Sequence, residues 1–491
     1  MKFRFTPGVF LGILFIITFV LHFRVFKMDI LGTHAWRQTY TQANIDCFYE
    51  EDNSIFHPRY LARGSGDGIR AQEFPVMQWT VAQTYFVFGQ SILTTRVVCF
   101  IMGLLSVWGF FLLLQLLTKN RATIYAGATM FTFSPLFYYY MINPLPDLLA
   151  LCAAVWCMYF YVRADQQKKF WLFAAATACL SVATLAKLPY IMFAGIPIGL
   201  MVIYLRNKGM KPAGYFLLIS GLLMIPALAW YISVLPEMQA NAVLAGIFSS
   251  SPDSRPILDA LVGNITDSLP ELFLGYTALP FFLVGLYLLF RYRAKLRRQY
   301  LPFVLAGILF LLYFFYEINL ISTVHDYYMM PFLPLLFLIA AWGWQYIFSF
   351  EKKVIRFIAI ALVVATPLTA FLKIDSRWNV NDPGFPIYWY TQRDQLRAAV
   401  PDSSLVIMGN DFTMCILPYY IHKRGWTYVD SEMQRYNVEC LIKEGAEYLY
   451  TNSEVTLNDT TLRPLFRREV GVYEGMHVFE LKKPAGEGEW K

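Results

Sequence analysis

The sequence predicts a polytopic α-helical membrane protein with a small α/β domain at its C-terminal end. The chain has 491 residues, of which 57% are hydrophobic and only 15% are charged, whereas a globular domain carries about 25% charged residues. Its first 374 residues contain eleven apolar segments, each close to the roughly 20 residues that cross a bilayer. After residue 374 the composition changes to short alternating strand-like and helix-like segments.

The expected membrane spans follow one another with short polar connections. They are 8–26, 93–117, 122–142, 147–163, 170–187, 188–205, 212–234, 271–290, 301–319, 328–349 and 354–373. The segment 76–90 is apolar but short and carries three glutamines, so we expect it at the membrane interface rather than across the bilayer. No small-residue cleavage site follows Phe26, which favours a retained first helix over a cleaved signal peptide.

Lysine and arginine alternate between the loops and so predict the orientation. One set of loops holds the basic clusters, namely Lys119/Arg121, Arg163/Lys168/Lys169, Arg206/Lys208/Lys211, Arg291 to Arg298 and Lys352/Lys353/Arg356. The other set is poor in basic residues apart from Lys187 and Arg255. The positive-inside rule places loops 27–92 and 235–270 and residues 375–491 on the outer side. The net charge of +7 therefore reflects membrane topology and does not indicate a nucleic-acid partner.

The segment from 375 to 491 is expected to form a second domain, separate from a membrane domain at 1–374 that includes loop 27–92. Strands are expected at 404–409, 426–429, 446–451, 466–473 and 476–481, with helices at 411–422 and 432–444. The β-α-β-α-β order predicts a partly parallel sheet, and the tail 485–491 is expected to be disordered. An oxidising compartment would permit a disulfide between Cys415 and Cys440, but spacing alone does not decide it.

Polar residues of four separate segments are predicted at the outer face. The first loop concentrates reactive side chains, namely His34, Trp36, Arg37, Gln38, Tyr40, Asp46, Arg59 and Glu73. The other three segments are 143–147 with Asp147, 187–189 with Lys187, and 325–328 with His325, Tyr327 and Tyr328. Polar groups at a bilayer edge cost free energy unless they are solvated, paired or functional. Their convergence on one face predicts a site.

Each of these residues also has a purely structural interpretation. Asp147 begins a helix, where a carboxylate satisfies free N–H groups and the helix dipole. Lys187 would reach the lipid headgroups as a snorkelling side chain. Tyr327 and Tyr328 are typical of interface aromatics, and His34 would simply be solvated in a polar loop. Only the shared placement of these residues favours a functional site over four independent structural roles.

The first loop carries the most specific motif of the chain. The run from His34 to Thr41 reads HAWRQTYT and resembles the HxWRQxDT motif of bacterial membrane glycosyltransferases of the GT-C superfamily. Their wider relatives include lipid A aminoarabinose transferases and dolichyl-phosphate-mannose protein mannosyltransferases. The resemblance continues through a further set of positions, namely Pro58-Arg59, Glu73-Phe74-Pro75, Phe88-Gly89, Arg96, Asp147, Lys187, His325, Tyr327 and Tyr328. The outer α/β domain fits it as well.

The resemblance implies a GT-C fold in the bacterial inner membrane with an active site on the periplasmic side. The implied reaction moves a sugar from a polyprenyl phosphate to a hydroxyl of a glycan, lipid or protein acceptor. His34, Asp147 and Glu73 are the implied catalytic residues. The implied phosphate and substrate ligands are Arg37, Gln38, Tyr40, Arg59, Lys187, His325, Tyr327 and Tyr328. Because the donor is a substrate, no cofactor is expected; no metal ligands are predicted, and a divalent ion is left open.

Three positions depart from the pattern of these relatives. Tyr40 stands where close relatives carry an aspartate, and His34 stands where distant relatives carry their carboxylate. Phe74 replaces the phosphate-binding lysine of the relatives that read Glu-Lys-Pro. Either another residue substitutes for the missing carboxylate, with His34, Asp46, Glu73 and Asp147 as candidates, or the reaction is altered or lost. A transporter of lipid-linked substrates and an inactive envelope-assembly scaffold are therefore the alternative functions, although the chain shows no repeated halves typical of transporters.

The orientation predicts which positions a membrane-impermeant thiol reagent reaches in intact cells. Cysteines introduced by Gly66→Cys and Gly486→Cys should be labelled, because both positions lie in segments predicted outside. A cysteine introduced by Ala294→Cys lies in a basic loop and should react only after the cells are broken open. Labelling of position 294 in intact cells would contradict the predicted orientation.

Overall fold

The computed structural model describes residues 6–64, 66–208, 210–240, 246–248, 256–293, 300–321, 325–381 and 383–482. Its contacts divide the chain into two compact units. The first, called the membrane unit, takes in Met1–Met28, Gln72–Met77 and Ile92–Ser376. The second, called the sheet unit, takes in Asp29–Ala71, Gln78–Ser91 and Arg377–Lys491. The expected tail 485–491 lies outside the described residues.

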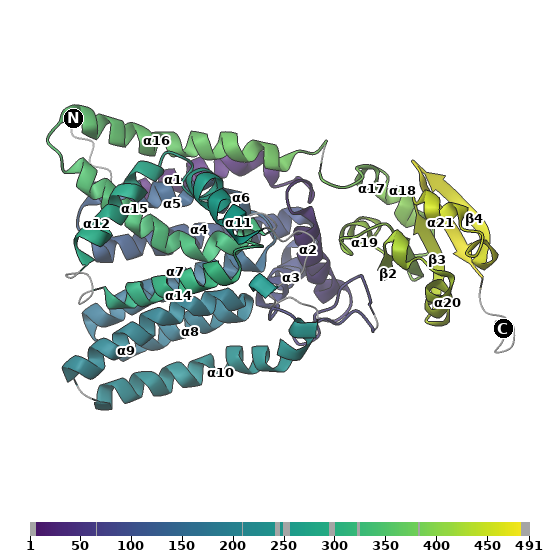
Figure 1. Ribbon diagram of the computed structural model, residues 1–491, viewed down its shortest axis with the longest axis horizontal. Coiled ribbons are helices and arrows are strands. Elements are labelled where there is room, and N and C mark those ends of the chain that lie inside the picture. Colours follow the sequence, from purple (N-terminus) through teal and green to yellow (C-terminus); the bar gives the residue numbers. More distant parts are fainter. Residues whose placement is uncertain are drawn as a thin grey trace. The chain divides into compact units, whose positions relative to one another are not determined.

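The membrane unit is helical (Figure 1). Its elements are α1 Pro7–His22, η1 Phe23–Val25, α4 Ile92–Leu117, α5 Arg121–Thr132, α6 Pro135–Tyr140, α7 Pro146–Gln167, α8 Phe170–Ala186, η2 Leu188–Ala194, α9 Gly195–Lys208, α10 Met210–Ala240, η3 Gly246–Phe248, α11 Ile257–Gly263, the π-helix η4 Asn264–Phe273, α12 Leu279–Arg291, α14 Leu301–Tyr316, η5 Asp326–Phe332, α15 Leu333–Phe348 and α16 Lys353–Asp375. The predicted class, a polytopic α-helical membrane protein, is confirmed.

Seven helical stretches in the described residues are long and apolar enough to cross a membrane. They are Pro7–Val25, Ile92–Leu117, Pro146–Gln167, Leu188–Arg206, Gly214–Met238, Asp326–Phe348 and Lys353–Trp378. Phe170–Ala186, Leu279–Arg291 and Leu301–Tyr316 are shorter apolar helices at further expected spans. The expected span 122–142 is divided into α5 and α6 before Pro135, because proline lacks an N–H and cannot continue the preceding helix. The number of eleven crossings stays a prediction.

Small residues let the helices of this unit approach closely. Helix α12 packs on α15, and α9 packs on α14, as the parallel ribbons of Figure 1 show. A Cβ added at Gly343 would lie 1.9 Å from the Phe281 carbonyl oxygen, and one at Gly195 would lie 2.4 Å from the Ala306 nitrogen. Glycine is therefore required at these crossings, in the manner of membrane helix interfaces where small side chains allow backbone contact.

A fully buried arginine joins the start of α4 to the turn that precedes α7. The Arg96 side chain is 0% exposed; its Nη1 donates to Asn143 Oδ1 at 2.6 Å and its Nε donates to the Met28 carbonyl at 2.9 Å. Asn143 Nδ2 in turn donates to the Tyr139 carbonyl at 3.0 Å. A buried cation is tolerated when its donors are satisfied, so this network holds the turn that leads into α7.

The sheet unit contains five strands and several short helices. The strands are β1 Leu405–Gly409, β2 Gly425–Tyr428, β3 Ala446–Thr451, β4 Phe466–Tyr473 and β5 Met476–Leu481. The helices are α2 Ala35–Glu50, α3 Val76–Phe88 (which begins within the membrane unit), η6 Ser376–Trp378, α17 Tyr388–Thr391, α18 Arg393–Ala398, α19 Ile416–Ile421, η7 Asp430–Glu432, α20 Arg435–Lys443, α21 Glu454–Asn458 and η8 Arg463–Leu465. All five expected strands are present, and α3 covers the apolar segment whose interfacial position stays a prediction.

The sheet has the order β2-β1-β3-β5-β4. Strands β2, β1 and β3 run parallel, whereas β5 and β4 pair antiparallel, so the expected partly parallel sheet is confirmed. The helix expected at 411–422 begins only at Ile416. Asp411 is the reason, because its carboxylate accepts hydrogen bonds from the Thr413 and Leu417 nitrogens and holds a turn there instead. Cys415 and Cys440 are free thiols.

Part of the first loop packs within the sheet unit. Helix α2 contacts α19, the Tyr419 hydroxyl donates to Asp29 Oδ1 at 3.1 Å, and the Arg63 nitrogen donates to the Gly425 carbonyl at 2.7 Å. The sequence grouped this loop with the membrane segments, whereas its contacts group Asp29–Ala71 with Arg377–Lys491. Contact grouping does not test independent folding, so the domain boundary between residues 374 and 375 stays a prediction.

Replacing Arg96 should lower the stability of the whole membrane unit. The variant Arg96→Met keeps much of the side-chain volume but leaves the carbonyl of Met28 and the amide of Asn143 without their donor, at a cost of about 3 kcal/mol. Thermal unfolding in detergent measures the effect. The variant Arg121→Met, at the exposed start of α5, serves as the matched control and should unfold with the wild type. Equal unfolding temperatures for both variants would show that the network is dispensable.

Candidate active site

The centre of the candidate site is the ammonium group of Lys187. Lys187 follows the last residue of α8 in an extended conformation, and its side chain is only 9% exposed. Its Nζ lies 2.5 Å from Glu73 Oε1 and 4.0 Å from Asp147 Oδ2. A snorkelling lysine would place its charge in water, so this burial between two carboxylates excludes that interpretation.

Asp147 is held at the start of α7 with its side chain 1% exposed. It is the second residue of the helix, after Pro146, and the Tyr190 hydroxyl donates to its carbonyl oxygen at 3.0 Å. The partial positive charge of a helix N-terminus favours a carboxylate there. The helix-dipole part of the structural interpretation and a place beside Lys187 therefore apply to the same residue and do not exclude each other.

Glu73 reaches Lys187 from the short segment Gln72–Met77. The Phe74 nitrogen donates to the Leu185 carbonyl at 3.1 Å, and the Trp230 indole donates to the Gln72 carbonyl at 3.0 Å. The Phe74 ring packs edge-on against Trp230, with centroids 4.9 Å apart. Phe74 thus makes an apolar contact at the position where some relatives carry lysine. The positive charge beside Glu73 comes from Lys187 instead.

Aromatic rings of η5 cover the other side of the ammonium group. Nζ of Lys187 lies 5.4 Å from the ring centre of Tyr328 and 5.9 Å from that of Tyr327, within the range of a cation–π interaction. His325 Nδ1 lies 3.2 Å from the Tyr327 hydroxyl, and its ring centre is 4.8 Å from that of Tyr328. Asp326 accepts a hydrogen bond from the Tyr140 hydroxyl. The structure therefore brings this whole motif to Lys187.

Glu317 is a carboxylate of the same cluster that the sequence analysis missed. It follows the last residue of α14 and is 8% exposed. Its carbonyl accepts from the Leu320 nitrogen at 2.9 Å, and the Leu320 carbonyl accepts from the His325 nitrogen at 3.2 Å. Tyr313, one turn earlier, lies within electrostatic range of Glu317, Tyr328, Asp147 and Tyr190. The available signal was an acidic residue near the end of the expected span 301–319, because ionisable residues in such segments are rarely without a function.

The predicted residues of the HAWRQTYT motif lie in the sheet unit. His34 precedes α2 with φ of 56°, and its carbonyl accepts from the Arg37 nitrogen at 3.1 Å. Gln38 Nε2 donates to the Thr33 carbonyl at 3.0 Å, and the Arg37 guanidinium lies 5.4 Å from the ring centre of Tyr40. The joint action of His34 and Arg37 with Asp147 and Lys187 stays a prediction, because the two sets belong to separate units.

Tyr40 does not supply the chemistry of the aspartate it replaces. Its ring stacks on Tyr60 with centroids 4.0 Å apart, and burial raises the pKa of the Tyr40 phenol well above its usual range. It therefore remains a neutral hydroxyl at physiological pH. A carboxylate for this motif has to come from elsewhere in the chain.

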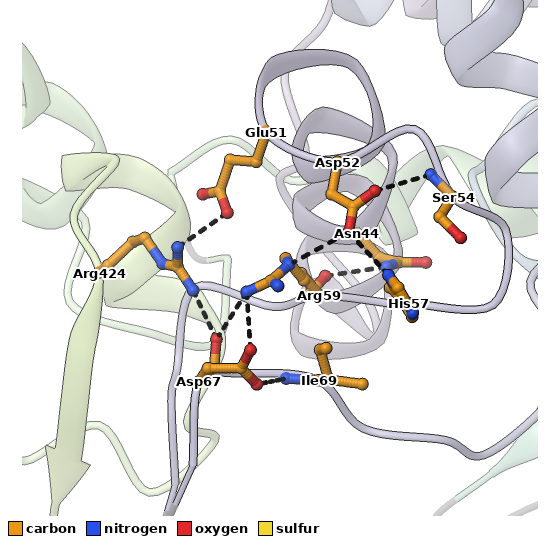
Figure 2. A network of polar contacts seen from close by, with 9 residues as sticks. All are labelled: Asn44, Glu51, Asp52, Ser54, His57, Arg59, Asp67, Ile69 and Arg424. Carbon is orange, nitrogen blue, oxygen red and sulfur yellow. Dashed lines mark hydrogen bonds and ion pairs between the residues drawn. The ribbon is translucent and has the colours of Figure 1, made fainter.

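Arg59 takes part in a network of ion pairs within the sheet unit (Figure 2). Its guanidinium lies 3.0 Å from Asp67 Oδ2 and 3.8 Å from Asp52 Oδ2. The Asp67 carbonyl accepts from Arg424 at 2.6 Å, and Arg424 also pairs with Glu51 at 2.8 Å. These contacts link the first loop to the residues before β2 and give Arg59 a structural role. Its predicted role in phosphate binding stays a prediction.

Asp46, a candidate substitute for the missing aspartate, is a buried group of α2. Its carboxylate accepts hydrogen bonds from Gln42 at 2.9 Å and from Gln90 at 3.2 Å. Burial raises the pKa of the Asp46 carboxyl to about 7.

Within the described ranges no group of three or more His, Cys, Asp or Glu side chains is arranged to hold a metal ion.

The helical membrane unit defines an integral membrane protein, and comparison with known proteins identifies its fold as GT-C. The sequence profile of the dolichyl-phosphate-mannose-protein mannosyltransferase family matches residues 72–230, a segment that includes Glu73, Asp147 and Lys187. Among curated proteins, none matches the chain in sequence.

Solved structures show where this fold occurs. ArnT from Cupriavidus metallidurans, in the apo state and bound to undecaprenyl phosphate, matches with a TM-score of 0.64 and 13% identity over 96% of this chain and 97% of ArnT. The oligosaccharyltransferase of Archaeoglobus fulgidus matches with a TM-score of 0.55 and 13% identity over 90% of this chain and 67% of its own. The mycobacterial arabinofuranosyltransferase AftD matches with a TM-score of 0.56 and 13% identity, over 96% and 41%. The expected GT-C fold is confirmed.

The raised pKa of Asp46 predicts that stability falls between mildly acidic and mildly basic pH. An unfolded aspartate titrates at 3.8, whereas the native Asp46 carboxyl titrates at about 7. Between these values the native state binds the extra proton, so the contribution of this group to stability is lost as pH rises through 7. Asp46→Asn should remove this contribution and narrow the difference between unfolding temperatures at pH 5 and pH 8. The control Asp394→Asn, whose side chain is 93% exposed, should keep the wild-type difference.

Proposed function

We propose that the protein is a glycosyltransferase that moves a sugar from a polyprenyl-phosphate donor to an acceptor hydroxyl on the outer face of a bacterial inner membrane. The observation that carries the proposal is the buried Lys187, held between Glu73 and Asp147 at the helix ends of a GT-C fold. Undecaprenyl phosphate is bound in one ArnT structure of the same fold, which supports a lipid-phosphate donor. Nucleotide sugars are absent outside the cytoplasm, and the sequence lacks a glycine-rich phosphate loop.

Lys187 would stabilise the leaving phosphate. As the bond between the anomeric carbon and the phosphate oxygen breaks, negative charge grows on the phosphate, and a pre-positioned cation lowers the free energy of that state. Glu73 fixes the ammonium at 2.5 Å, so the charge is already in position when the phosphate departs. Arg37 is the second candidate phosphate ligand, because a guanidinium fork matches phosphate oxygens.

The rings beside Lys187 would bind the sugar. Tyr327 and Tyr328 meet edge to face, with centroids 5.1 Å apart, and His325 lies against both rings. Such a wall offers apolar faces for the C–H side of a sugar and polar atoms for its hydroxyls. A sugar bound there would lie next to the phosphate ligand, where the transfer has to occur.

The acceptor hydroxyl needs a base, because it attacks the anomeric carbon well only when its proton is removed. The hypothesis from the sequence is that either His34 or Asp147 is the base and that the other residue orients the acceptor. Glu73 is the alternative base. Imidazole and carboxylate both accept protons in enzymes. The acceptor itself is a glycan, a lipid or a protein, and the proposal covers all three.

A transporter of lipid-linked substrates is the second candidate function, and an inactive scaffold is the third. Both would bind polyprenyl phosphate without turnover. The dense carboxylate–lysine cluster favours the enzyme, because a transported lipid needs no base beside its phosphate. Turnover is thus the property that separates the first function from the other two.

The proposal predicts turnover with a lipid donor and its loss on removing Lys187. Purified protein should transfer sugar from polyprenyl-phosphate sugars to an envelope extract and should not use nucleotide sugars. Lys187→Met should lower the rate about a hundredfold, since a charge-assisted phosphate contact stabilises the transition state by about 2–3 kcal/mol. Lys353→Met, at an exposed position at the start of α16, is the matched control and should retain the full rate. Use of a nucleotide sugar as sole donor, or full activity of Lys187→Met, would refute the proposal.

A further inference from the structure

Glu317 is a buried carboxylate of the membrane unit, at the turn that follows α14. Its residue is 8% exposed, yet among the residues that the structure describes no hydrogen bond or ion pair engages its carboxylate. Lys187 acts on it only through longer-range charge interaction. Burying an ionised carboxylate in this way is costly, which is unusual for a group without a function.

The three carboxylates of the cluster differ in the charges that surround them. Glu73 is in direct contact with the Lys187 ammonium at 2.5 Å, and a cation at that distance favours the ionised form. Asp147 lies 4.0 Å from the same ammonium and in the first turn of α7, where the helix dipole also favours the anion. Both groups thus have positive charge close by.

Glu317 has the opposite surroundings. It directly follows the C-terminal end of α14, where the partial negative charge of the helix disfavours an anion. The titratable groups that interact with it are the Lys187 ammonium and the phenols of Tyr313 and Tyr316. Tyr313 also interacts with Tyr328, Asp147 and Tyr190. In its burial and its position at a helix C-terminal end, Glu317 differs from the other two carboxylates, and it is the one best placed to accept a proton.

We propose that Glu317 is the base that accepts the proton of the acceptor hydroxyl, an inference that rests on the proposed glycosyl transfer. The acceptor oxygen forms its bond to the anomeric carbon while its proton passes to the Glu317 carboxylate. The bond from the anomeric carbon to the phosphate oxygen breaks, and the electron pair leaves with the polyprenyl phosphate beside Lys187. Asp147 then orients the acceptor. No co-reactant is needed, because the proton is released to water after the product departs.

The test compares Glu317→Gln and Glu317→Asp with the wild type and with Glu351→Gln, an exposed carboxylate between α15 and α16. Turnover of a polyprenyl-phosphate sugar, binding of polyprenyl phosphate and thermal unfolding are measured for each protein from pH 5 to pH 9. Glu317→Gln should lose about 10²- to 10⁴-fold in turnover number, the usual contribution of a general base. Its phosphate binding and unfolding temperature should stay at the wild-type values.

The pH profile separates a base from a structural residue. The wild-type rate should fall toward low pH as the base becomes protonated, and the residual rate of Glu317→Gln should lack that fall. Glu317→Asp should recover part of the rate, and Glu351→Gln should match the wild type. If the wild type turns over and Glu317→Gln turns over at the same rate, Glu317 is not the base, while the proposed function stands. Loss of binding or folding in Glu317→Gln would overturn the role of Glu317 too, whereas an inactive wild type would refute the proposed function itself.

Discussion

The burial of the Lys187 ammonium group constrains the arrangement of the membrane unit more than any other single interaction. A lysine that is 9% exposed has to be paired, because an unpaired buried charge costs several kcal/mol. Its partners come from three different places, the segment before α3, the start of α7 and the residues of η5. These three segments therefore have to lie close together, which constrains how the helices connected to them pack.

Several apolar and polar contacts hold the segments around Lys187 in place. Arg96 holds the turn before α7, glycines of α9 pack against the first half of α14, and α14 contacts η2. Trp230 and Leu185 fix the backbone on either side of Glu73. Each contact is ordinary in itself. Together they position charged side chains on backbone that is already rigid, which is what transition-state stabilisation by fixed charges requires.

The sheet unit shows how the motif of the first loop tolerates its unusual residues. Tyr40 stacks on Tyr60 where close relatives of the motif carry an aspartate, and Arg59 pairs with Asp67. No residue at this position therefore replaces the carboxylate that the motif lacks. In the proposed reaction the carboxylates of the membrane unit supply the acidic groups instead, with Glu317 as the base. A departure from a family motif need not imply lost activity when a second element can provide the group.

The sequence alone determined the class of protein and most of its elements. Long apolar segments can only be satisfied as helices in a bilayer, and the alternation of strand and helix signals after residue 374 leads to the β2-β1-β3 parallel arrangement. It also named Lys187, Asp147, Glu73 and Tyr328, because charged and aromatic residues are conspicuous beside apolar segments. It missed the break before Pro135 and the late start of α19, where local hydrogen bonding by Asp411 overrides the helical pattern.

Only the tertiary structure decided which of these residues act together. Pairing of Lys187 with Glu73 joins positions 114 residues apart in the chain, and no periodicity or spacing encodes such a contact. Glu317 became visible for the same reason, since its importance lies in what surrounds it and not in its neighbours along the chain. Charge interactions depend on distance and burial in three dimensions, so the chemical character of each carboxylate follows from the packed structure and not from the order of the residues.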